Sequence, residues 1–128
     1  MQIKVPVSVG ELVDKLVILE IKAERIGDAA KRANVVHERD LLRETVKRAV
    51  PGSKELDRLT GELKKINEQL WVIEDDIRDC ERSRDFGARF VELARAVYVT
   101  NDRRAALKKD INLLVGSDIV EEKSYKTY

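Results

Sequence analysis

The chain has 128 residues, with 25 Lys or Arg against 24 Asp or Glu, so its formal net charge at pH 7 is +1. The length suits one domain, residues 1–128, with its own hydrophobic core. The balanced charge and the low aromatic content, 5%, argue against nucleic-acid binding. A single Cys excludes an internal disulfide or a thiolate metal cluster. We expect no cofactor.

At the N-terminus, Ile3, Val5 and Val7 alternate with polar residues and predict a short strand. Pro6 would confine that strand to a sheet edge. A helix start follows at once, so we expect no signal peptide, and no apolar run approaches the roughly 18 residues of a membrane span. These features predict a cytoplasmic protein.

Residues 9–27 predict the first helix. Ser8 and Glu11 have the spacing of a capping box, and Gly27 provides the stop. The helix is apolar nearly all round, so we expect it to be buried and central. Its narrow polar window holds Glu11, Lys15 and Lys22. Because an unpaired buried ammonium group is costly, these lysines need an anionic partner, either carboxylates or a ligand.

Asp28 can cap a second, polar helix that stops before Pro51. Ser53 then caps a third helix, over about 54–83. This helix has a coiled-coil-like repeat, with an apolar residue at every third or fourth position and no interruption. The repeat comprises Leu56, Leu59, Leu63, Ile66, Leu70, Ile73, Ile77 and Cys80. This helix would be about 45 Å long, which calls for a hairpin partner or a second subunit.

Asp85 can cap a fourth helix that Gly116 closes. Its apolar stripe is interrupted by Thr100, Asn101 and Arg104. Either a new helix begins there, or a polar patch lies inside the helical seam. Together these elements predict an all-α, four-helix bundle-like domain in which the third and fourth helices form a long antiparallel hairpin. A short strand pairing between the chain ends is an additional option.

Antiparallel pairing of the last two helices places Glu74 near residues 97–101 and Asn67 near residues 101–104. Two interpretations follow. One is a buried polar layer in which Glu74 pairs with Arg104 or Lys15 and fixes the helix register. The other is a cation-rich pocket for a small carboxylate or phosphate. The candidate ligand-binding residues are Lys15, Lys22, Asn67, Glu74, Asn101, Arg104 and Lys108.

The acidic run of Glu74, Asp75, Asp76 and Asp79 has the side chains of a Mg²⁺ or Ca²⁺ site, but mostly faces solvent, so we expect no metal. The tail, residues 117–128, is either a frayed end or, through its apolar and tyrosine side chains, a docked segment.

Four stretches carry a resemblance to a known family. They are VPVSVGELVDKLVILEIKAERI (5–26), INEQLWVIEDDIR (66–78), ARAVYVTNDRRAALKKDIN (94–112) and SDIVEEKSY (117–125). They resemble an uncharacterised family of short bacterial helical proteins, with similar segments beside glycosyltransferase or repeat modules. The resemblance implies no activity and assigns no residue a role.

The sequence therefore predicts a non-enzymatic helical interaction module that forms a homodimer through the third and fourth helices and takes a protein partner. The alternative is a binding protein or enzyme for a small anionic metabolite, such as a carboxylate, phosphate or nucleotide-sugar. Its cation-rich pocket would lie between the first, third and fourth helices. A void between these helices would favour the metabolite, and a closed polar layer would favour the module.

Overall fold

A computed structural model describes all 128 residues and contains four α-helices and no strand. The helices are α1 (Val9–Arg25), α2 (Ala29–Ala49), α3 (Lys54–Arg82) and α4 (Ala88–Val115). The all-α prediction is confirmed. None of the helices is both long and apolar enough to cross a membrane.

Local capping explains where the first three helices begin. The side chains of Ser8, Asp28 and Ser53 each accept a hydrogen bond from a backbone N–H in the first turn, as predicted. Gly116, with φ of 68°, adopts the left-handed conformation that ends α4.

The predicted cap of the fourth helix was wrong. Gly87, not Asp85, is the N-cap of α4, and it makes no side-chain capping bond. Asp85 instead accepts a hydrogen bond from the Gly87 N–H, 3.1 Å away, inside the preceding turn. Arg84 in that turn has a φ of 57°, a left-handed conformation that belongs to a turn. The chain therefore changes direction at residues 83–87, and α4 begins only after this turn.

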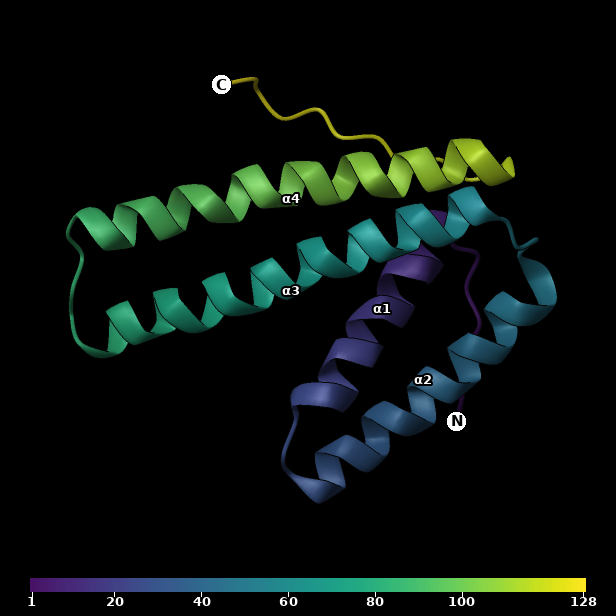
Figure 1. The fold of residues 1–128 in the computed structure, drawn as a ribbon, viewed down its shortest axis with the longest axis horizontal. Coiled ribbons are helices and arrows are strands. Elements are labelled where there is room, and N and C mark those ends of the chain that lie inside the picture. Colours follow the sequence, from purple (N-terminus) through teal and green to yellow (C-terminus); the bar gives the residue numbers. More distant parts are fainter.

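The four helices form two antiparallel hairpins, α1–α2 and α3–α4, set at an angle to each other (Figure 1). α1 packs against all three other helices, whereas α2 packs only against α1 and has no buried residue. α1 therefore joins the two hairpins, as its nearly all-round apolar surface predicts. It meets α3 near the N-terminal end of α3, and the other half of the α3–α4 hairpin extends beyond it (Figure 1).

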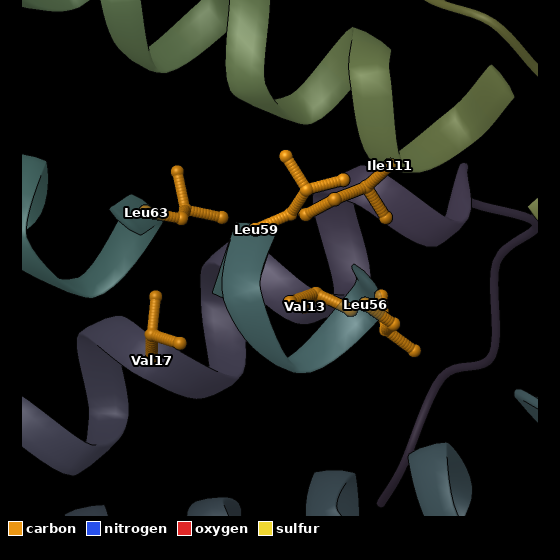
Figure 2. Close-up of a cluster of buried hydrophobic side chains, with 6 residues drawn as sticks. All are labelled: Val13, Val17, Leu56, Leu59, Leu63 and Ile111. Atoms are coloured by element: carbon orange, nitrogen blue, oxygen red, sulfur yellow. The ribbon is translucent and has the colours of Figure 1, made fainter. Parts of the chain in front are cut away.

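The hydrophobic core lies where α1 crosses the long hairpin. Its buried members come from three helices: Val13 and Val17 of α1, Leu56, Leu59 and Leu63 of α3, and Ile111 of α4 (Figure 2). Only the first three turns of the α3 repeat therefore contribute to it. Further along α3, Leu70, Ile73 and Ile77 are only half-buried.

α4 is continuous through the interruption of its apolar stripe. No new helix begins at Thr100 or Asn101. Thr100 is buried, and Asn101 and Arg104 are half-buried. The polar patch therefore lies inside the helical seam, which was the second of the two interpretations.

The chain ends do not pair as strands. Residues 1–7 are exposed and form no regular structure, whereas the tail returns along α4 (Figure 1). The Tyr128 hydroxyl donates a hydrogen bond to Asp102 Oδ2, 2.6 Å away, and its ring packs edge-to-face on Tyr98. The tail is thus docked on α4 through side-chain contacts.

Candidate functional site

A buried carboxylate, Asp14, lies at the centre of the polar residues of the seam. Its side chain is 1% exposed. Asp14 Oδ1 accepts hydrogen bonds from Asn67 Nδ2 of α3 at 2.8 Å and from Arg104 Nε of α4 at 3.0 Å. Arg104 Nη2 lies 2.5 Å from the other oxygen, Oδ2. The guanidinium therefore holds the carboxylate by both oxygens, the geometry that makes such pairs strong and directional.

A second ion pair lies one turn away along α1. Lys108 Nζ is 2.5 Å from Glu11 Oε2 and 3.9 Å from Asp14 Oδ2. On the other side of Arg104, Nη1 donates a longer hydrogen bond, 3.5 Å, to Asn101 Oδ1. The hydrogen bond to Asp14 raises the pKa of the Arg104 guanidinium above its usual value, although partial burial opposes the shift.

The start of α1 is held close against α4 next to this layer. The Gly10 N–H donates a 2.6 Å hydrogen bond to Asn112 Oδ1. A Cβ atom on Gly10 would collide with the Lys108 carbonyl oxygen. The absence of a side chain at this position therefore lets the two helices approach closely enough for Lys108 to reach Glu11.

The tail closes the same end of the molecule. The Ser8 hydroxyl donates a 2.7 Å hydrogen bond to Glu121 Oε1, and Ser117 Oγ accepts one from the Val9 N–H at 3.1 Å. Lys109 pairs with Glu122 at 2.9 Å. These three contacts at the start of the tail add to those that Tyr128 makes with Asp102 and Tyr98 at its end.

We name Asp14, Asn67, Arg104, Lys108 and Glu11 the Asp14 layer. No buried side-chain nitrogen or oxygen in the chain lacks a hydrogen-bond partner. Two shallow hollows, lined by α3 with α4 and by α3 with Arg25, are open to solvent and include no member of the layer. The layer is therefore a hydrogen-bonded set of polar side chains that joins three helices, with Asp14 and Asn67 buried and Arg104, Lys108 and Glu11 partly exposed.

The structure brings together four of the seven candidate site residues, Asn67, Asn101, Arg104 and Lys108. The other three lie elsewhere. Lys15 pairs with Glu38 of α2 at 3.5 Å, Lys22 is half-buried further along α1, and Glu74 pairs with Arg78 at 3.4 Å in its own helix.

The carboxylate that the polar layer needs was assigned wrongly. Asp14, not Glu74, is the partner of Arg104. Glu74 lies two turns beyond Asn67 on α3, where it pairs with Arg78 of its own helix. A usable signal existed, because Asp14 lies between Val13 and Val17 on a helix that is apolar nearly all round. An acidic residue there has to be paired.

The fold and this layer define a small all-α protein in which buried ion pairs fasten one helical hairpin to another. Residues 3–128 match a family of unknown function, DUF6165, and the chain belongs to that family. The resemblance to an uncharacterised family is thereby confirmed. No curated protein and no solved structure matches the chain.

Proposed function

We propose that this protein is a non-enzymatic helical interaction module that works as a homodimer. One observation carries the proposal. The chain exposes 9142 Å², about 2200 Å² more than the roughly 6900 Å² expected of a compact monomer of 14.6 kDa. Each partner of a standard protein interface buries only about 800 Å². The exposed elements include the chain ends, α2, which has no buried residue, and the half of the α3–α4 hairpin that extends beyond α1.

The mass of the protein in solution tests the proposal. Sedimentation equilibrium at micromolar concentration should give twice the chain mass of 14.6 kDa. A monomer at high micromolar concentration would contradict the homodimer.

The alternative is binding of a small anionic metabolite by the cations of the seam. It has weaker support, because Arg104 and Lys108 already hold carboxylates of α1. A thermal-shift screen against dicarboxylates, phosphates and nucleotide sugars tests it. A saturable shift of several degrees that Arg104→Met abolishes would favour the metabolite over the module, provided that the variant remains folded.

A further inference from the structure

The α3–α4 hairpin has one face covered by α1 and an opposite face that no helix covers. Asn67 and Arg104 bind Asp14 of α1. Gln69 and Ala106, two residues further along each helix, line a shallow groove of about 430 Å³ between α3 and α4. Two residues turn a helix by about 200°, so this groove lies on the side away from α1. We name this uncovered side of the α3–α4 hairpin the open face.

The open face continues along the hairpin as a stripe of apolar side chains. Ile66 and Leu107 line the groove. Ile73 lies two turns beyond Ile66 on α3, and Val99 lies two turns before Ala106 on α4, so both share the same faces of their helices. Leu107 also packs against the hydrophobic core, and all four of these apolar side chains are only half-buried. Two packed helices cannot enclose such a stripe, and a further helical layer is needed to bury it.

The charges of the hairpin indicate which partner supplies the further helical layer over the open face. On the open face itself, α3 presents Glu62 and Lys65 in the groove and Asp76 two turns beyond Gln69, one net negative charge in all. On α4, the same face presents Arg103 in the groove and, three to four turns before Ala106, Arg95 and Glu92, one net positive charge in all. The two helices therefore carry net charges of opposite sign on this face. A two-fold dimer uses the same patch twice, so this patch must complement itself. Placing α3 on α4 of a partner brings opposite charges together, whereas α3 on α3 would bring two faces of net negative charge together.

We infer that the open face of α3–α4 packs against the open face of a second copy of this chain, with α3 of each copy facing α4 of the other. The result is an antiparallel four-helix bundle whose two-fold axis runs along the hairpins. Both turns at residues 83–87 lie at the same end. The inference rests on the proposed homodimer and names its interface.

The substitution Ala106→Arg tests the interface. Ala106 is exposed and mid-helix, and an arginine there would have Asp110 four residues further along α4, so the chain should still fold. Buried in a dimer, the same arginine would be crowded and desolvated. Ala33→Arg places the same change at an exposed alanine in the second turn of α2 and is the matched control.

We expect sedimentation equilibrium to show dimers for the natural chain and for Ala33→Arg. For Ala106→Arg, we expect the dissociation constant to rise by at least about tenfold, with unchanged helix content by circular dichroism. If the natural chain is a dimer and Ala106→Arg leaves its dissociation constant unchanged, the open face is not the interface, although the homodimer stands. If the natural chain is a monomer, the homodimer and this interface both fail.

A distance across the dimer tests the orientation. Glu81 is exposed in the last turn of α3. A spin label on Glu81→Cys, in a Cys80→Ala background, should lie within about 20 Å of its copy, roughly two interhelical spacings. Hairpins with their turns at opposite ends would separate the labels by about 40 Å, the length of α3, and would overturn the arrangement.

Discussion

Asp14 shows how a single residue can join three helices. A buried carboxylate is costly unless it is paired, and here α3 supplies an amide and α4 a guanidinium. These contacts fix the position of α1 on the hairpin, because Asp14 is the carboxylate with which Arg104 forms an ion pair. The layer thus sets the register of the two hairpins as well as their contact.

Asp14→Ala should therefore destabilise the fold strongly. It leaves Arg104 and the Asn67 amide without their partner, and breaking a buried pair in this way costs about 3 kcal/mol. Urea unfolding followed by circular dichroism measures the change. Asp75→Ala, at an exposed carboxylate of α3, is the control and should change the free energy of unfolding by less than about 0.5 kcal/mol. Equal effects of the two substitutions would show that the Asp14 layer contributes nothing specific.

Gly10 and Gly61 should respond in opposite directions to replacement by alanine. At Gly10 the new methyl group would meet the Lys108 carbonyl and Asn112, so we expect a loss of about 1–3 kcal/mol. At Gly61, inside α3, nothing lies within 4 Å, and removing glycine from a helix interior should add about 0.5–1 kcal/mol. Urea midpoints measure both. A neutral Gly10→Ala would mean that α1 can move away from α4 at no cost.

At the scale of elements, the tail behaves as a strap rather than a loose end. It contacts the start of α1 through Ser8 and crosses back over α4 to Asp102. The hydrogen bond to Asp102 is the main cause that raises the pKa of the Tyr128 hydroxyl above its usual value of 10.0. The strap therefore has one contact that depends on pH.

This contact should be lost in alkaline solution. A raised pKa in the folded state means that the contact contributes fully below pH 10 and disappears as pH rises through the higher, folded value. We expect the NMR signals of the Tyr128 ring to move toward random-coil values above about pH 10. Tyr128→Phe cannot make this bond, so its ring signals should already show the released position at pH 7. A folded-state midpoint below 10 would contradict the assignment.

The helix starts were predictable because their causes are local. Ser8, Asp28 and Ser53 cap helices whose first turns they adjoin, so a few residues of sequence suffice. The buried pair was not predictable in the same way. Asp14 and Arg104 are 90 residues apart, and finding the pair requires the point at which α1 crosses the hairpin. Without that crossing point, Glu74 was a plausible carboxylate partner for Arg104.

At the scale of the whole molecule, the exposed surface is large for the chain length, and only 18 of 128 residues are buried. A homodimer that buries part of this surface links stability to concentration. Raising the protein concentration about tenfold should therefore raise the melting temperature by about 3 °C. Differential scanning calorimetry measures the shift, and Ala106→Arg should show a smaller one. A melting temperature independent of concentration would argue against coupled folding and association.

The helix with no buried residue, α2, has a consequence for how the molecule opens. Because α2 packs only against α1, it can detach while the core of α1, α3 and α4 and the Asp14 layer remain intact. Its amide hydrogens should exchange with solvent through this partial opening, well before those of α1. The protein then has two levels of stability, and the lower one belongs to the segment that connects α1 to the long hairpin.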